Sequence, residues 1–553
     1  MKRRNFVRNV GAGIILPKFI HGMDLKLNAA EELAAAMSGN TDHILIVVQL
    51  EGGNDGLNTL LPVDQNYDRL LQLRPNIISG TSSKRKDGYL PLNNVTEARL
   101  HPSMEAVKNL YNEGMIQFIN GVSVGNHSSS HPAATRMVLN ASTRDLNGNY
   151  GWLGELLESK YPGYTDFSNF PNNLTDFPVS IEFGNYSSLL LQASSGPMNV
   201  LLNSARHFCN LYFGTTIDAQ GNCTYKSENS CSVTSPIPGH TEAMRAQSNL
   251  QYLRAFSQVA DKYACVLRKA YDKSKSNSVN TDQFLGSICG YNYNENKVIS
   301  ELDVQMRTIA YWINGGLPTQ VYQVRHDGYD LHGGLSNSHG YLLNQVSGSI
   351  ANFMQLLAPE KRDKVLGIVI TEFARTIKEN GSQGADHGTS NMMFTFGHQV
   401  NGGILGKNPT IPDPQLFNDP KTFDLANNQA SQFDFRSVYN TIMRQWFCVD
   451  EPTVQKIIGG KKEDSNGIVI ENWDLLPLFK NSPCCTDLAQ PVITGNQQVC
   501  ADDTYTYSTA QVTGATYNWT IQGGRITAGQ GSATVSVAWD NQTVGTLNVK
   551  VSK

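Results

Sequence analysis

Short apolar runs alternate with amphipathic stretches along most of the chain. Two runs are almost wholly apolar, as is typical of central strands in a parallel sheet covered on both faces: ILIVVQL at 44–50 and KVLGIVI at 364–370. MIQFING at 115–121 is a further strand candidate. Apolar residues at helical spacing predict helices over 102–113, 338–357 and 435–447. Strands that alternate with helices predict an α/β domain with a doubly wound, mostly parallel sheet.

The pattern changes at two places and so predicts further parts. Residues 240–275 read as one or two amphipathic helices, which we expect to form an inserted cap within about 200–300 of a domain that spans 39–480. From 486 to 553, alternating Thr, Val, Tyr and Trp are broken by Gly and Asn at short intervals. This second pattern is typical of a small antiparallel all-β sandwich.

The N-terminus, MKRRNFVRNVGAG, places Arg3 and Arg4 before a weak apolar stretch. Residues 1–38 therefore resemble a twin-arginine signal peptide and leader, and the alternative is a basic disordered tail. Such a signal implies the twin-arginine export machinery as a partner and a periplasmic or extracellular protein. No apolar run approaches the roughly 20 residues that cross a bilayer, so we expect no transmembrane segment in the mature protein.

Composition and cysteine content narrow the class further. The formal charge of −4 gives no electrostatic footprint for nucleic acid, which we therefore exclude as the main ligand. The 9 cysteines suit an oxidising compartment, and bridges are plausible around Cys223 and Cys231 and around Cys484, Cys485 and Cys500. The sequence contains no CxxC pair, so it does not predict a zinc ribbon. The odd number of cysteines leaves at least one thiol unpaired.

Polar residues that directly follow an apolar strand are candidates for a site, because ligands of open α/β sheets bind beyond the carboxyl ends of the strands. The stretch LEGGNDGLN at 50–58 places Asn54 and Asp55 there, although Asp55 is also suited to an Asx-type turn. In GNHSSSHPAATR at 125–136, Ser130 and His131 precede an expected helix whose N-terminus favours an anion. Ser130 is equally suited to be an N-cap.

Two later stretches combine carboxylates with imidazoles. VRHDGYDLHGGLSNSH at 324–339 contains Asp330, His332 and His339, and TEFART with GADHG contains the residues Glu372, Arg375, Asp386 and His387. Carboxylate and imidazole together suit zinc, whereas carboxylates alone suit magnesium, calcium or manganese. Histidines that are merely scattered over loops are the alternative interpretation of any single member.

The order of these motifs resembles a known family. GGNDGLN, LHP at 100–102, the Ser130–His131 pair, GYDLH, TEFART followed by GADHG, NGGILG and DFRSVYNTIMRQW resemble domain of unknown function 1501 over about 40–450. That family is similar to the alkaline phosphatase and sulfatase superfamily, whose members hydrolyse phosphate or sulfate esters at one or two metal ions with a Ser, Thr or modified Cys nucleophile. The C-terminal stretch resembles the PKD-like immunoglobulin-type modules of secreted bacterial enzymes, notably in the Bacteroidetes.

The resemblance implies roles for the candidate residues. Asp55 would be the first metal-binding carboxylate, Asp330 and His332 the central ligands, and Glu372 the strand-end ligand. His387, supported by Asp386, would be a later ligand. Ser130 would be the nucleophile, and a guanidinium would hold an anionic oxygen, the candidates being Arg375 and Arg136. Asn54, His131 and His339 are further candidates. Two features depart from the superfamily pattern, since Phe373 rather than His follows Glu372 and no CxPSR signature occurs.

The sequence thus predicts an exported hydrolase of an anionic small-molecule ester or glycan ester that uses one or two divalent ions, namely zinc, calcium, magnesium or manganese. The alternative is a non-catalytic phosphatase-like scaffold that binds glycan or another cell-surface component. The sequence contains no GxGxxG or haem motif, so nothing in it supports binding of an organic cofactor.

Overall fold

The computed structural model contains two compact units. It describes residues 23–25, 42–79, 88–123, 130–142, 148–165, 175, 177–203, 209, 212–219, 223–225, 263–274, 300–463, 469–481, 484, 493–496, 498–501, 503–511, 516–540 and 544–552. The larger unit holds the described residues within Asp42–Thr441 and Gln455–Asn481. The smaller unit holds those within Met1–Thr41, Ile442–Val454 and Ser482–Lys553.

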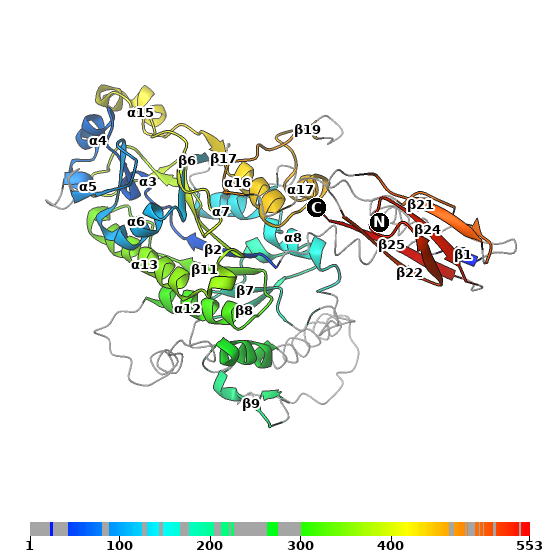
Figure 1. The fold of residues 1–553 in the computed structure, drawn as a ribbon. Helices are drawn as coiled ribbons and strands as arrows, with labels where there is room; N and C mark the ends of the chain where they lie inside the picture. Colours follow the sequence, from blue (N-terminus) through cyan, green and yellow to red (C-terminus); the bar gives the residue numbers. More distant parts are fainter. Residues whose placement is uncertain are drawn as a thin grey trace, which may run out of the picture. The chain divides into compact units, whose positions relative to one another are not determined.

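A large mixed sheet organises the larger unit (Figure 1). Its strand order among the described residues is β16 (Gly403–Leu405), β6 (Ile116–Ser123), β15 (Asn391–Phe396), β12 (Val365–Thr371), β2 (Ile44–Leu50), β11 (Val321–His326), β7 (Ser180–Phe183) and β8 (Asn199–Leu202). β17 (Phe433–Asp434) pairs with β6 in addition. All pairings are parallel except those of β15, which runs antiparallel to β12 and β6. The predicted mixed α/β class with a mostly parallel sheet is confirmed.

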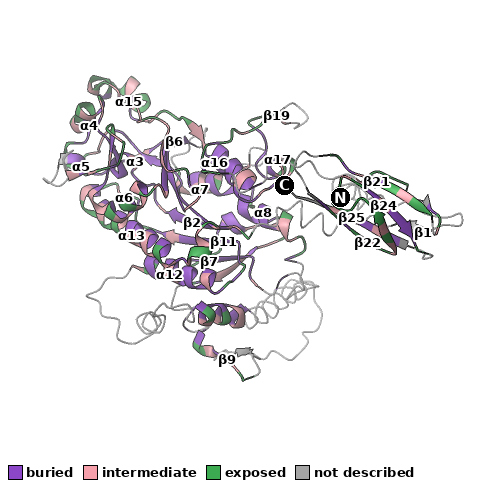
Figure 2. Ribbon diagram, in the orientation of Figure 1, coloured by how far each residue is buried: buried purple, intermediate pink, exposed green. Residues whose placement is uncertain are grey.

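One face of this sheet is covered by three helices. α12 (Glu301–Asn314) packs on α13 (Leu335–Leu356), and α13 packs on α6 (Glu105–Asn112). The alternate β2 residues Ile46, Val48 and Leu50 join this core, because successive side chains of a strand point to opposite faces. Figure 2 shows β2 and β11 buried, α12 buried along nearly its whole length, and α13 with both buried and exposed positions.

The other face carries the remaining principal helices: α7 (His131–Asn140), α8 (Trp152–Lys160) and α16 (Phe435–Thr441), which lie near one another in Figure 1. Trp152 of α8 stacks on Tyr439 of α16, with ring centroids 4.5 Å apart. Arg436 of α16 donates from Nε to the Ala141 carbonyl at the end of α7, at 3.0 Å. Helices on both faces explain why the central strands are continuous apolar runs.

The remaining described elements are short helices and small sheets. The helical ones are α3 (Gly56–Thr59), α4 (Tyr67–Leu73), α5 (Pro75–Ser79), η3 (Pro102–Met104), η5 (Leu189–Leu191), α14 (Pro359–Arg362), η6 (Pro414–Asn418), α15 (Pro420–Ala426), the π-helix η7 (Ile442–Trp446) and α17 (Glu451–Ile458). The small sheets pair β3 (Leu60–Pro62), β5 (Ala98–Leu100) and β4 (Leu90–Pro91), β13 (Ala374–Arg375) with β14 (His387–Gly388), β9 (Thr215–Ile217) with β10 (Cys223–Tyr225), and β18 (Lys462–Glu463) with β19 (Val469–Glu471).

The predicted strands and helices correspond closely to these bounds, but part of the predicted insert cannot be compared. The helix predicted at 435–447 is α16 followed by the π-helix η7. Residues 263–274 of the predicted insert are helical. The rest of that amphipathic stretch and the Arg3–Arg4 motif lie outside the described residues.

The smaller unit is all-β at its C-terminal end, as predicted. One sheet orders β20 (Gln498–Val499), β1 (Met23–Leu25), β25 (Val544–Ser552) and β22 (Thr516–Gln522), and the other orders β21 (Thr504–Ser508), β24 (Thr534–Trp539) and β23 (Gly524–Ala528). Val499, Tyr507, Trp519, Val535, Val537, Trp539 and Leu547 are buried together. The N-terminal strand β1 pairs with strands from near the C-terminus, which the sequence pattern did not predict.

The smaller unit also contains a disulfide between Cys448 and Cys484. Cys209 and Cys265 of the larger unit are disulfide-bonded as well. Cys500 is a free, exposed thiol among the described cysteines. The expected bridging of Cys484 is therefore confirmed, but its partner is 36 residues away rather than within the cluster that contains Cys485 and Cys500.

Candidate metal centre

Three chain segments meet at the carboxyl ends of β2, β11 and β12. The loop after β2 contains Gly52 and Gly53, the loop after β11 contains Asp330, and Glu372 directly follows β12. Gly52 has a φ of 116°, and a Cβ there would lie 2.4 Å from the Asp330 nitrogen. Only glycine therefore allows the two loops to touch. The Gly52 amide donates to Oε1 of Glu372 at 2.8 Å, which joins the third segment.

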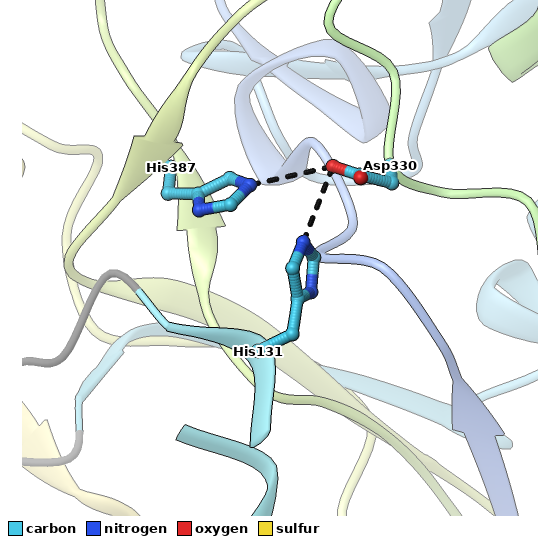
Figure 3. A group of neighbouring side chains, drawn as sticks. All are labelled: His131, Asp330 and His387. Carbon is cyan, nitrogen blue, oxygen red and sulfur yellow. Dashed lines mark hydrogen bonds and ion pairs between the residues drawn. The ribbon is translucent and has the colours of Figure 1, made fainter. Parts of the chain in front are cut away.

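His131, Asp330 and His387 converge on this position (Figure 3). His131 is the first residue of α7, and His387 lies in β14. Their Nε2 atoms are 3.4 and 3.3 Å from Oδ1 of Asp330. The three ligand atoms lie within 4.8 Å of one another.

His332 adds a third imidazole to the same oxygen. Its Nε2 atom is 3.1 Å from Oδ1 of Asp330 and 2.9 Å from Nε2 of His387. Its Nδ1 atom is 2.9 Å from Oδ1 of Asp386. The resemblance paired Asp386 with His387, whereas the structure gives this carboxylate to His332.

Two of the imidazoles have a carboxylate at Nδ1. Glu372 is 3.0 Å from Nδ1 of His131, in the same way that Asp386 serves His332. Because an ionised carboxylate only accepts hydrogen bonds, each neutral ring carries its proton at Nδ1 and presents a lone pair at Nε2. A second-shell carboxylate of this kind is common behind histidines that bind metal ions.

The inner donor atoms fit a cation. If both rings are neutral with the proton at Nδ1, Nε2 of His131 and of His332 directs a lone pair at a carboxylate oxygen, and Nε2 of His131 has no hydrogen-bond partner among the described residues. Facing lone pairs repel, so a proton or a metal ion is needed between them. Ligands of a tetrahedral zinc ion, about 2.1 Å from it, lie about 3.4 Å apart. The separations of Asp330 from His131 and His387 match that spacing.

Arg375 fixes Asp330 from the protein side. Its guanidinium is fully buried and donates to Oδ1 of Asp330 at 2.8 Å, as well as to the carbonyls of Gly52, Gly53, Tyr329 and Ala385. Partial burial acts to raise the pKa of Asp330, but the hydrogen bond and charge of Arg375 outweigh it and lower the pKa to about 2. The resemblance gives Arg375 a contact with a substrate oxygen, whereas in this structure the buried guanidinium donates to Asp330.

Asp386 is held in its ionised form by its neighbours. Partial burial acts to raise its pKa, but the hydrogen bonds of Asn380 and His332 outweigh this effect and lower the pKa below its ordinary value. Nδ2 of Asn380 donates to the same oxygen that faces His332, at 2.9 Å. The carboxylate therefore keeps its acceptor character toward the Nδ1 proton of His332.

Asp55 serves the fold of the loop in this structure. It is 2% exposed, its Oδ2 accepts from Nη1 of Arg74 at 2.6 Å, and its Oδ1 accepts from the Asn58 amide at the start of α3. Arg74 is itself fully buried. Both oxygens are engaged by protein donors, so the Asx-type alternative describes Asp55 better than the ligand role.

Asn54 and His339 form a buried polar network behind the same loop. Nε2 of His339 is 2.9 Å from Oδ1 of Asn54, and its Nδ1 is 2.9 Å from Nδ2 of Asn58. Tyr89 donates to Oδ1 of Asn58 at 2.5 Å. Burying satisfied polar groups stabilises one loop conformation, so these residues support the site without facing it.

Ser130 immediately precedes α7, and Arg136 lies within this helix. Ser130 is exposed at the N-cap position, but its side chain makes no capping hydrogen bond. Arg136 is exposed and lines a cavity of about 620 Å³ together with His131, Asp330 and Glu372. The centre therefore opens into a space large enough for a small ligand.

The residues around the cavity differ in how clearly the sequence marks them. His131 is a further candidate in the sequence, and its place at the start of α7 is a usable signal. Glu51, Tyr186 and Arg325 also line the cavity and were not predicted. Glu51 directly follows β2 and could have been found by the strand-end rule, whereas nothing local marks Tyr186.

Comparisons with known proteins agree with parts of this picture. The family described as protein of unknown function, DUF1501, matches residues 317–458, and the PKD-like domain family matches residues 487–553. The first range contains Asp330, His332 and Glu372 but not His131. No curated protein matches the chain.

One solved structure with distant similarity comes from Bacteroides thetaiotaomicron, from a core genetic locus for the metabolism of multiple glycosaminoglycans. It has 8% identity, a TM-score of 0.29 and 89% coverage of each chain. Among the described residues, no helix is both long and apolar enough to cross a bilayer.

Proposed function

We propose that the protein is a metal-dependent hydrolase of a phosphate or sulfate ester, of the alkaline phosphatase and sulfatase type, that acts outside the cytoplasm. The observation that carries the proposal is the set of imidazole Nε2 atoms around Oδ1 of Asp330, with carboxylates behind two of the rings. The disulfide between Cys448 and Cys484 supports an oxidising compartment.

His131, Asp330 and His387 would hold the ion, and His332 adjoins them as a fourth donor. Zinc is our first candidate, because imidazole nitrogen with one carboxylate suits zinc better than calcium or magnesium. When bound, such an ion polarises the ester and stabilises negative charge on the leaving oxygen.

The protein's own residues would prepare the reaction. Glu372 and Asp386 hold the Nδ1 protons of His131 and His332, and Arg375 fixes the orientation of Asp330. Arg136 would attract the anionic ester into the cavity. Ser130 stays our candidate nucleophile because it immediately precedes His131, and trapping of a covalent intermediate on Ser130 would test this role.

Elemental analysis of the purified protein tests the proposal directly. We expect one stoichiometric divalent ion, bound more tightly as zinc than as calcium, and hydrolysis of an aryl phosphate or aryl sulfate. Asp330→Ala and His387→Ala should abolish both properties, while His398→Ala, which changes a histidine outside the centre, should change neither. A protein that binds zinc, manganese and calcium only non-stoichiometrically would instead support the non-catalytic scaffold.

A further inference from the structure

The cavity beside the metal centre is larger than an ester group requires. Its volume is about 620 Å³, within the range of pockets that enclose whole small molecules. His131, Asp330 and Glu372 line it together with a second group of residues that includes Glu51, Tyr186 and Arg325. This second group is available to contact the alcohol part of an ester whose charged group lies at the metal centre.

Tyr186 presents an aromatic surface to this cavity. It is 61% exposed, although a large aromatic side chain gains free energy by burial. The Arg325 guanidinium carbon lies 4.0 Å from the ring centroid and covers one face. The Tyr186 hydroxyl donates to Oε1 of Glu51 at 3.3 Å. The ring is thus fixed at one face and at its tip, and its remaining surface is left exposed beside the cavity.

A buried ion pair holds Arg325 under this ring. The Arg325 side chain is 7% exposed and donates from Nη2 to the fully buried Glu182 and to the Tyr186 carbonyl, the latter at 2.5 Å. Glu182 also accepts from the Ser188 amide at 3.0 Å and from Asn199 at 2.6 Å. Because Arg325 is held firmly and packs on the ring of Tyr186, ordering these side chains costs little entropy when a ligand binds. The aromatic surface is therefore preorganised.

One polar atom of this assembly lacks a hydrogen bond. Nε of Arg325 has no hydrogen-bond partner among the described residues, and the nearest ion-pair contact is Oε1 of Glu51 at 3.9 Å. Leaving a buried charged donor unpaired is costly, so a ligand oxygen in the cavity would stabilise it. A hydroxyl oxygen can accept from Arg325 and donate to Glu51 at the same time.

The surrounding groups distinguish between kinds of alcohol. Gln49 supplies an amide, Glu51 a carboxylate and Ser188 a hydroxyl group around the aromatic surface. Burial raises the pKa of Glu51, although the charge of Arg325 opposes the effect. An aryl alcohol would stack on Tyr186 but use none of these polar groups, and an acyclic alkyl alcohol would use neither. A sugar ring has an apolar C–H face for the aromatic surface and hydroxyls for the polar groups.

We propose that Tyr186, Arg325 and Glu51 form a sugar-binding subsite, so that the substrate is a phosphate or sulfate ester of a sugar whose ester group lies at the metal centre. This inference rests on the proposed function for its catalytic part. Binding of the sugar ester can be measured separately from its hydrolysis. Failure of the subsite can therefore be distinguished from failure of the proposed hydrolase function.

The experiment uses calorimetry with glucose 6-phosphate, glucose 6-sulfate, methyl phosphate and 4-nitrophenyl sulfate as probes. We expect the two sugar esters to bind wild type more tightly than methyl phosphate. Tyr186→Ala should weaken sugar-ester binding about tenfold, which corresponds to the loss of one aromatic contact. Tyr186→Phe, which keeps the ring, should lose less, and Tyr341→Ala, which removes another exposed tyrosine, should lose nothing.

Three results would overturn the subsite: sugar esters that do not bind, sugar-ester affinity within twofold of wild type in Tyr186→Ala, or 4-nitrophenyl sulfate that binds more tightly than glucose 6-sulfate through the same tyrosine. Metal content should be unchanged in Tyr186→Ala. If wild type holds no metal ion but sugar esters still bind in a manner that depends on Tyr186, the hydrolase proposal fails and the subsite stands.

Discussion

Nδ1 of His131 lies 3.0 Å from Oε1 of Glu372, across 241 residues of sequence. The same ring has Nε2 3.4 Å from Oδ1 of Asp330. In the proposed metal centre Glu372 would orient the ligand His131 rather than bind the ion itself.

Glu372→Gln should weaken zinc binding about 10–100-fold without changing the number of ions per chain, because a second-shell group tunes a ligand that remains present. His131→Ala should lower the stoichiometry instead. Competition with a zinc chelator measures the affinity, and Glu360→Gln, at an exposed glutamate, is the matched control. Equal loss of stoichiometry in Glu372→Gln and His131→Ala would make Glu372 a direct ligand.

Asp55→Asn should destabilise the fold while the folded protein keeps its metal ion. The substitution leaves Arg74 buried without a charged partner, which costs on the order of 3–5 kcal/mol. Urea denaturation measures the free energy of unfolding, and elemental analysis of the folded fraction measures the ion. A stable Asp55→Asn protein without metal would restore the ligand role implied by the family resemblance.

Asp330 should stabilise the metal-free protein in a pH-dependent way. Its pKa is lowered to about 2 in the folded state from an ordinary value of 3.8. The contribution is therefore complete above the unfolded value and is lost as pH falls toward the folded value. The difference in free energy of unfolding between wild type and Asp330→Asn should shrink from about pH 5 to pH 3. A difference that stays constant over this range would contradict the link between Asp330 and Arg375.

The disulfide should stabilise the protein through its unfolded state. Cys448 and Cys484 are separated by 36 residues, and closing a loop of that length is worth about 4 kcal/mol in the chain-entropy description. Replacing both with serine should lower the free energy of unfolding by an amount of this order, measured by urea denaturation. Cys500→Ser removes the free thiol and should have no such effect. A double-serine variant as stable as wild type would contradict the prediction.

Local pattern was sufficient for the main elements of the fold. The run ILIVVQL is β2 from Ile44 to Leu50, and the helix predicted over 338–357 is α13, which begins at Leu335 and ends at Leu356. The hydrophobic pattern is sufficient here because β2 is buried along its whole length and α13 buries one set of apolar side chains in the same core. It gave no sign that β15 runs antiparallel or that β1 pairs with β25, since strand pairing depends on distant segments.

The sequence by itself determined which residue types reach the carboxyl ends of the strands: Asp330, Glu372 and His387 follow apolar strands or lie on the loops beyond them. Only the tertiary structure decided their partners. Arg74 takes the carboxylate of Asp55, Glu372 takes Nδ1 of His131, and Asp386 takes Nδ1 of His332. The physical reason is that a carboxylate can serve a metal ion, a guanidinium or an imidazole equally well. The choice among them is made by distances between segments that are far apart in sequence.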